Sequence, residues 1–169
     1  KTWAAETFPF TTSLAGKKVG IVGMGRIGQE LAARLLPFKV EIAYHGPSSK
    51  SLPYVFFPSL MDLALESDVL ILTCPGGKAT EKIINTSILN ALGPKGYLIN
   101  VARGSVVNED DLISALQNKV IAGAALDVFE NEPNPKPAFL SLSNVLLAPH
   151  IGSATQETRQ AMTNLAIDN

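Results

Sequence analysis

The chain has 169 residues, 46% of them hydrophobic and 17% charged, with a formal net charge of −1, which suits one globular domain and excludes a disordered chain. Lys and Arg are scattered, so we expect no nucleic-acid partner and no membrane surface. A single cysteine, no metal-binding spacing and no apolar run near the roughly 20 residues of a membrane span predict a cytoplasmic protein without a metal site.

Residues 1–15 open the chain without helical or strand periodicity, and they carry Trp3, Phe8 and Phe10. Two interpretations stay open. The segment is an arm that packs its aromatic side chains on another surface, such as a second subunit, or a lead-in segment that lies on its own domain. We therefore divide the chain into a lead-in arm, residues 1–15, and a domain, residues 16–169.

Short apolar runs then alternate with helical patterns. The predicted strands are 18–23, 40–45, 68–74, 96–102, 121–128 and 144–149, and the predicted helices are 26–36, 59–66, 86–92, 109–118 and one from about Thr155. Apolar runs alternating with amphipathic helices indicate a parallel sheet covered on both sides. With right-handed crossovers, this predicts an α/β fold, a doubly wound parallel sheet of about six or seven strands. The Pro-rich stretch 133–139 is predicted to be a surface loop.

Gly23, Gly25 and Gly28 follow the first predicted strand and open the first helix, as in a dinucleotide-binding turn. In such a turn, Gly23 permits the tight bend and Gly25 lets backbone N–H groups approach a pyrophosphate. Gly28 lets the helix pack closely on the sheet. The phosphate charge then lies at the positive end of the helix. We therefore predict that the chain binds a dinucleotide cofactor.

An acidic residue that grips the ribose of NAD is expected at the end of the second strand. Glu41 lies 18 residues after Gly23, but it starts that strand, whereas ligands bind beyond the carboxyl ends. The strand ends instead at His45-Gly46. Possible donors to a 2′-phosphate there are His45, Ser48, Ser49 and Lys50. The pattern favours NADP(H) over NAD(H); the alternative is an ordinary polar turn in a protein that is indifferent or weakly NAD-selective.

Arg103, Glu132 and His150 each follow a later predicted strand, at the edge where an open α/β sheet places its site. Reducing a keto acid needs a cation for the substrate carboxylate and carbonyl, a proton donor, and a group that tunes the donor. Arg, His and a carboxylate hydrogen-bonded to imidazole meet these needs. Each residue alone also has common structural roles, such as pairing with a helix end. The three together favour a catalytic site.

Four segments together resemble the cofactor-binding domain of the D-2-hydroxyacid dehydrogenase family. They are "GIVGMGRIGQELAARL", "INVARGSVVNEDDLISAL", "AALDVFENEP" and "NVLLAPHIGSATQETRQAM". The resemblance covers residues 17 to 169. It implies that Arg103 binds the substrate carboxylate and carbonyl, that His150 passes the proton and that Glu132 supports His150.

The resemblance also implies a set of cofactor contacts. Asp127 corresponds to the acid that hydrogen-bonds the nicotinamide carboxamide. The other implied contacts are the backbone of Arg26 and Ile27, the ribose loop with Cys74, Pro75 and Thr80, the wall formed by Val101 and Ala102, and Arg103, His150 and Gly152. Cys74 is interpreted as a small apolar strand residue or a cofactor neighbour, and not as a nucleophile.

Within the family, "IAYHGPSSK" with "TCPGGKAT" is similar to the NADPH-preferring glyoxylate/hydroxypyruvate reductase branch, from which it departs at Pro47, where that branch carries Arg. The resemblance implies an oxidoreductase transferring a hydride between NADP(H) and a small 2-hydroxy or 2-keto acid, and a homodimer. Family members are about twice as long, so we expect a longer two-domain enzyme whose substrate domain is absent from this chain. The alternative function is a nucleotide-sensing, corepressor-like regulator on the same fold.

Overall fold

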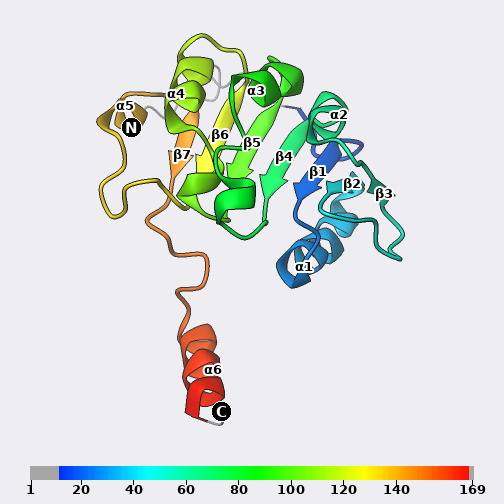
Figure 1. The fold of residues 1–169 in the computed structure, drawn as a ribbon, viewed down its shortest axis with the longest axis vertical. Helices are drawn as coiled ribbons and strands as arrows, with labels where there is room; N and C mark the ends of the chain where they lie inside the picture. The colour runs from blue at the N-terminus through cyan, green and yellow to red at the C-terminus, as the bar shows by residue number, and fades with distance from the viewer. Residues whose placement is uncertain (1–11, 168–169) are drawn as a thin grey trace, which may run out of the picture.

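A computed structural model of the protein describes residues 12–167, so Trp3, Phe8, Phe10 and the predicted arm up to residue 11 lie outside the described residues. The described residues form a seven-stranded parallel sheet with the strand order β3-β2-β1-β4-β5-β6-β7 (Figure 1). The strands are β1 (Lys18–Val22), β2 (Glu41–His45), β3 (Val55–Phe56), β4 (Val69–Leu72), β5 (Tyr97–Asn100), β6 (Gly123–Leu126) and β7 (Val145–Leu147). The order reverses between β1 and β4, where such sheets place a ligand crevice.

Helices connect the strands. They are α1 (Arg26–Leu35), α2 (Leu60–Leu65), α3 (Thr86–Leu92), α4 (Glu109–Gln117), α5 (Pro137–Leu140) and α6 (Gln156–Ile167), with the short 3₁₀ helices η2 (Leu36–Phe38), η3 (Lys78–Thr80) and η4 (Gly104–Val106). The starts of α2, α3 and α4 are capped by the side chains of Ser59, Asn85 and Asn108, which accept backbone N–H groups. The predicted α/β class and doubly wound parallel sheet are confirmed.

Two local features differ from the sequence predictions. The strand β3 was not predicted, because two residues are too few to show an alternating pattern. The surface loop predicted at 133–139 is wrong at its end, because Pro137 begins α5 and the Phe139 side chain is fully buried. Proline suits the first position of a helix, where its missing N–H would have no partner.

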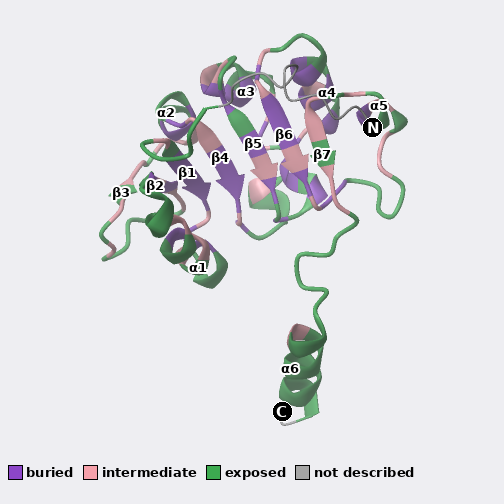
Figure 2. Cartoon of the chain, turned by 180° about the vertical axis from the view of Figure 1, so that it is seen from behind, coloured by how far each residue is buried: buried purple, intermediate pink, exposed green. Residues whose placement is uncertain are grey.

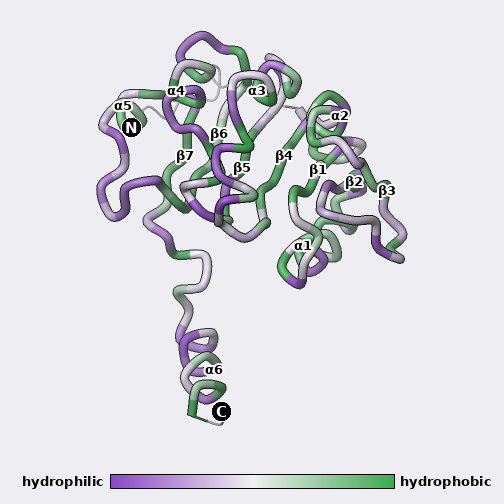
Figure 3. The backbone as a smooth tube through the Cα atoms, in the orientation of Figure 1, coloured by the Kyte–Doolittle hydropathy of each residue, from purple (hydrophilic) through white to green (hydrophobic). Residues whose placement is uncertain are grey.

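The core lies on both faces of the sheet, and adjacent strand residues divide between the two. On one face, Ile71 joins a cluster with Ile21 and with Ala32 of α1. On the other, Leu70 and Leu72 join a larger cluster that includes residues of α2, α3 and α4. The central strands β1 and β4 are therefore mostly buried and apolar (Figures 2 and 3), whereas the edge strands β3 and β7 are partly exposed. This arrangement holds the carboxyl ends of β1, β4, β5, β6 and β7 at one edge of the sheet.

The helix α6 stands away from this body at the end of an extended segment (Figure 1), and its residues are exposed except for the half-buried Thr158. Its amino-terminal connection, residues 148–155, passes the carboxyl end of the sheet and carries His150. Among residues 12–167, no helix combines the length and apolar character that a membrane span needs.

Candidate nucleotide-binding and catalytic site

The glycine turn is tight toward the sheet and open on its outer side. Gly23 has a φ of +99°, and a Cβ there would lie 2.5 Å from the backbone nitrogen of Cys74. A Cβ on Gly28 would lie 2.4 Å from the carbonyl oxygen of Gly23, so α1 packs directly on the turn. A Cβ on Gly25 would meet nothing within 4 Å. The turn therefore leaves room for a pyrophosphate at the start of α1.

Residues directly after β4 contact this turn and hold it in place. The Thr73 hydroxyl donates to the carbonyl oxygen of Gly23 at 2.6 Å, a contact that the sequence analysis missed. The Thr80 hydroxyl donates to the carbonyl oxygen of Pro75 at 2.6 Å and so closes the loop between them. Burial raises the pKa of the Cys74 thiol, which keeps it neutral and unreactive at physiological pH. Cys74 thus has the character of a small apolar residue.

A cleft of about 1000 Å³ extends from the glycine turn to His150. It brings together Gly25, Arg26, Ile27, Cys74, Pro75, Val101, Ala102, Arg103, Glu132 and His150 from the predicted site. Further lining residues that were not predicted include Thr73, Ser105 and Phe129. Contributions come from the loops after β1, β4, β5, β6 and β7, so the five carboxyl ends converge on one cleft.

Other predicted residues lie outside the lining of the cleft. Gly23 and Gly28 lie beneath it as packing positions, and Thr80 braces its loop. Asp127 directs its carboxylate at the chain after His150, because Oδ1 and Oδ2 accept the N–H groups of Ile151 and Gly152 at 2.8 and 2.9 Å. Each carboxylate oxygen retains a further lone pair, so the contact of Asp127 with a nicotinamide amide stays a prediction.

His150 and Glu132 form a hydrogen-bonded pair at the cleft. The Nδ1 atom of His150 lies 2.7 Å from Oε2 of Glu132, and Oε1 of Glu132 accepts the N–H of Phe129 at 3.1 Å. The hydrogen bond with His150, followed by that with Phe129, lowers the pKa of Glu132, so its carboxylate is ionised at neutral pH. An ionised carboxylate at Nδ1 requires a proton on that nitrogen, so in the neutral ring the lone pair lies on Nε2.

The backbone around Arg103 is fixed by Asn100, a residue that the sequence analysis missed. Asn100 ends β5 and is 1% exposed; its Oδ1 accepts the N–H of Ala102 and its Nδ2 donates to the carbonyl oxygen of Arg103, both at 3.0 Å. The Arg103 side chain folds along its own loop, with Nη1 donating to the carbonyl oxygen of Ala102 at 2.6 Å. A polar residue that ends a buried strand was the sequence signal for this role.

The end of β2 forms a separate polar loop. His45 Nδ1 lies 3.0 Å from the carbonyl oxygen of Phe57, and a carbonyl there requires Nδ1 to be the donor. The hydroxyl of Tyr44 accepts the N–H of Lys50 at 2.7 Å and donates to the Lys50 carbonyl oxygen at 3.3 Å. The side chains of Ser48, Ser49 and Lys50 are exposed. The loop therefore has a fixed backbone that presents polar side chains to solvent.

Comparison with known proteins identifies the family. Residues 1–152 match the family described as D-isomer specific 2-hydroxyacid dehydrogenase, NAD binding domain. The chain belongs to this family. It is 51% identical to 2-ketogluconate reductase of Gluconobacter oxydans (strain 621H) over 168 residues, 99% of this chain and 54% of that protein. It is 44% identical to a glyoxylate/hydroxypyruvate reductase A of Arabidopsis thaliana, with the same coverage of each.

The fold of this dehydrogenase-family domain is also seen in solved structures. The NADPH-dependent glyoxylate/hydroxypyruvate reductase of Sinorhizobium meliloti, in complex with NADP and malonate, superposes with a TM-score of 0.93 at 50% identity. The match covers 98% of this chain and 52% of that one. The chain thus spans about half the length of these relatives and contains their NAD(P)-binding domain. Among the described residues, no group of three His, Cys, Asp or Glu side chains is placed to hold a metal ion.

Proposed function

We propose that the protein containing this domain is an oxidoreductase that transfers a hydride between NADP(H) and a small 2-hydroxy or 2-keto acid. The observation that carries the proposal is the Glu132–His150 pair, 2.7 Å apart, which lines the same cleft as Arg103 and the start of α1. A proton-transfer pair beside a nucleotide-binding turn suits carbonyl reduction, where hydride and proton reach the same C=O group.

The residues of the cleft fit a dinucleotide. Gly25 is open where the backbone of Arg26 and Ile27 starts α1, and the cleft continues from there to Val101, Ala102 and His150. The bound cofactor supplies or accepts the hydride. The first N–H groups of α1 hold the pyrophosphate charge, because these donors have no partner within the helix.

The remaining chemistry belongs to three side chains. The guanidinium of Arg103 binds the substrate carboxylate and polarises the carbonyl through its planar set of donors. His150 gives a proton from Nε2 to the carbonyl oxygen during reduction and removes it during oxidation. Glu132 stays ionised, fixes the ring through Nδ1 and stabilises the imidazolium, which is the role that its lowered pKa supports.

We further propose a preference for NADP(H). The only carboxylate on β2 is Glu41, at the opposite end of the strand from His45, about 13 Å away at a rise of roughly 3.3 Å per residue. Beyond the carboxyl end, His45, Ser48, Ser49 and Lys50 offer donors to a 2′-phosphate. The NADP complex of the 50% identical Sinorhizobium meliloti enzyme supports this assignment.

The test is NADPH oxidation, compared with NADH oxidation, by the full-length protein. Suitable substrates are glyoxylate and hydroxypyruvate, named by the Arabidopsis relative, 2-ketogluconate, named by the Gluconobacter relative, and pyruvate as a minimal 2-keto acid. We expect turnover on at least one of them, faster with NADPH. Nucleotide binding without turnover on any of them would favour the regulator, which has no use for the Glu132–His150 pair.

Two further expectations belong to the whole protein. A homodimer is proposed from the aromatic residues Trp3, Phe8 and Phe10, and light scattering of the full-length protein at micromolar concentration tests it. A cytoplasmic location is proposed from the composition, with its single cysteine, and fractionation of cells tests it.

A further inference from the structure

A buried carboxylate beside the cleft has no part in the reaction proposed above. Glu109, the first residue of α4, is 3% exposed, whereas its neighbour Asp110 is exposed. Its Oε1 accepts the N–H of Glu130 at 2.8 Å, and its Oε2 has no hydrogen-bond partner in the described part of the chain. Burial raises the pKa of Glu109, so placing an ionised carboxylate here is unfavourable in itself.

The start of α4 does not explain this burial. An acid in the first turn of a helix is stabilised only modestly by the helix dipole. Asp110 and Asp111 already supply that charge without being buried. What distinguishes Glu109 is its reach to Glu130, a residue 21 positions away in the loop that follows β6. We call residues 127–132 the β6 loop.

The β6 loop carries Glu132, and two carboxylates accept hydrogen bonds from successive backbone N–H groups of the loop. The N–H of Phe129 donates to Glu132, at 3.1 Å, and the next N–H, that of Glu130, donates to Glu109, at 2.8 Å. On the side of η4, a Cβ on Gly104 would lie 1.9 Å from the carbonyl carbon of Phe129. The Phe129-Glu130 step is therefore enclosed between η4, α4 and the Glu132 carboxylate.

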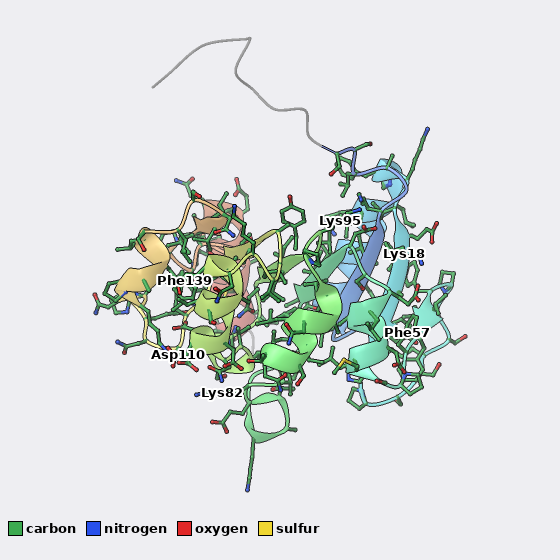
Figure 4. The ribbon with its side chains drawn as sticks, turned by 90° about the horizontal axis from the view of Figure 1, so that it is seen from above. Lys18, Phe57, Lys82, Lys95, Asp110 and Phe139 are labelled. Atoms are coloured by element: carbon green, nitrogen blue, oxygen red, sulfur yellow. The ribbon has the colours of Figure 1, made fainter. Side chains whose placement is uncertain are left out.

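The other contacts of Glu130 are at the surface. Its carboxylate pairs with Lys82 at 3.4 Å and with Lys136 at 3.8 Å, and Lys136 also pairs with Asp110 at 2.6 Å. Figure 4 shows Lys82 and Asp110 near each other at one edge of the molecule. Partly exposed pairs of this kind contribute little to stability and weaken with salt. Among the contacts of Glu130, the buried bond to Glu109 is the one made by its backbone.

We propose that Glu109 is a positioning residue: by accepting the N–H of Glu130 it fixes the β6 loop and so sets where the Glu132 carboxylate stands relative to the His150 ring. The kinetic consequence of this inference rests on the proposed function. A displacement of about 1 Å would lengthen the 2.7 Å contact between Glu132 and His150 beyond hydrogen-bond distance, and such misplacement can lower turnover about 100-fold.

Three substitutions distinguish the length of the Glu109 side chain from its charge. Glu109→Gln keeps an acceptor at the same reach without the charge, Glu109→Asp keeps the charge but is about 1.5 Å shorter, and Glu109→Ala removes both. In the full-length protein we expect Glu109→Gln to keep kcat within about threefold, and the other two to lower it roughly 10- to 100-fold with KM for NADPH unchanged. The reverse order, with Asp active and Gln impaired, would assign Glu109 to the helix charge and overturn the proposal.

Asp111 provides the matched control, because it is also a first-turn acid of α4 and accepts one backbone N–H, that of Thr86, at 2.9 Å. It has no hydrogen bond to the β6 loop among the contacts of the described residues. We expect Asp111→Ala to leave kcat within about twofold of the wild type. If Asp111→Ala lowers kcat as much as Glu109→Ala does, the effect belongs to α4 as a whole and the proposal fails.

A spectroscopic readout tests the positioning role without turnover. The chain has two histidines, His45 and His150, so the ring ¹H–¹⁵N correlations of this 169-residue chain contain an internal reference. We expect the His150 Nδ1 signals to match the wild type in Glu109→Gln and to shift in Glu109→Asp and Glu109→Ala, with His45 unchanged. Unshifted His150 signals in Glu109→Asp, with His45 as in the wild type, would overturn the proposal. A wild type without turnover would refute the proposed function alone.

Discussion

The Nδ1 atom of His150 lies 2.7 Å from Oε2 of Glu132, although the two residues follow different strands, β7 and β6. In the proposed reaction this contact leaves Nε2 to exchange the proton. We therefore expect His150→Asn to lower kcat of the full-length protein by roughly 10²- to 10⁴-fold, the usual contribution of a general acid or base. The Kd for NADPH, from fluorescence titration, is expected to stay the same. Wild-type turnover in this variant would remove His150 from the mechanism.

Gly25 is a position where a substitution is expected to weaken nucleotide binding without destabilising the fold. A Cβ there would meet nothing within 4 Å, and its φ of −78° suits any residue. Gly25→Ala is therefore expected to unfold at the same urea concentration as the wild type and to bind NADPH at least tenfold more weakly. Gly23→Ala, with its Cβ against Cys74 and a φ of +99°, serves as a contrast that destabilises the fold. Equal NADPH affinity in Gly25→Ala would place the pyrophosphate elsewhere.

Gly46 is the position at which cofactor choice can be changed. It lies directly beyond β2, and a Cβ there would also meet nothing within 4 Å. Gly46→Asp would place a carboxylate where it can accept the ribose hydroxyls of NADH and repel a 2′-phosphate. We expect the ratio of kcat/KM for NADPH to that for NADH to fall at least tenfold. An unchanged ratio would mean that this loop does not contact the 2′ position.

Tyr44 holds the same loop from within the core. Its buried hydroxyl bonds both the N–H and the carbonyl oxygen of Lys50. Tyr44→Phe keeps the ring packed and releases Lys50, so the loop loses its fixed backbone. The expected result is weaker binding of NADPH by about three- to tenfold, a loss of roughly 1 kcal/mol, with NADH affinity unchanged. Isothermal titration with both nucleotides makes the comparison, and equal losses for the two would contradict it.

Asp68 gives a stability prediction that depends on pH. Its carboxylate accepts the N–H of Lys18 at 2.9 Å and pairs with Lys17 at 3.1 Å, and these contacts lower its pKa. Because the pKa is lower in the folded state, the stabilisation is present above the ordinary value of about 3.9 and is lost as the pH falls through the folded value. Asp68→Ala is expected to cost about 1 kcal/mol at pH 7 and less at pH 3, measured by urea unfolding. A cost independent of pH would contradict this assignment.

The fold was predictable wherever a segment is long enough to show its own periodicity. The predicted strand at 40–45 and helix at 86–92 correspond to β2 and α3 because burial on the sheet dictates each pattern locally. The two residues of β3 form a strand because they pair with Ala43 and Tyr44 of β2. No pattern in the local sequence predicts this pairing. Phe139 is buried because α5 packs against the sheet. The surrounding prolines indicated a surface loop instead.

The candidate site divides in the same way. Residues at strand ends, such as Arg103 and His150, were predictable because the topology alone brings strand ends to one edge. The supporting residues were not. Thr73, Asn100 and Glu109 act through hydrogen bonds between their side chains and backbone groups, and nothing in the local sequence specifies which backbone group each one reaches. Their identity follows from packing between loops that are distant along the chain.

Cys74 lies just after β4, buried against the glycine turn. The reactivity of its thiol can therefore report local opening of the structure around that turn. A thiol that is shielded and neutral reacts with a disulfide reagent only when the structure around it opens. Because it is the one cysteine in the sequence, the labelling rate follows local opening around the glycine turn without any engineered probe. A nucleotide held by the turn would slow that reaction, so occupancy of the cleft can be followed by the colour change of the reagent.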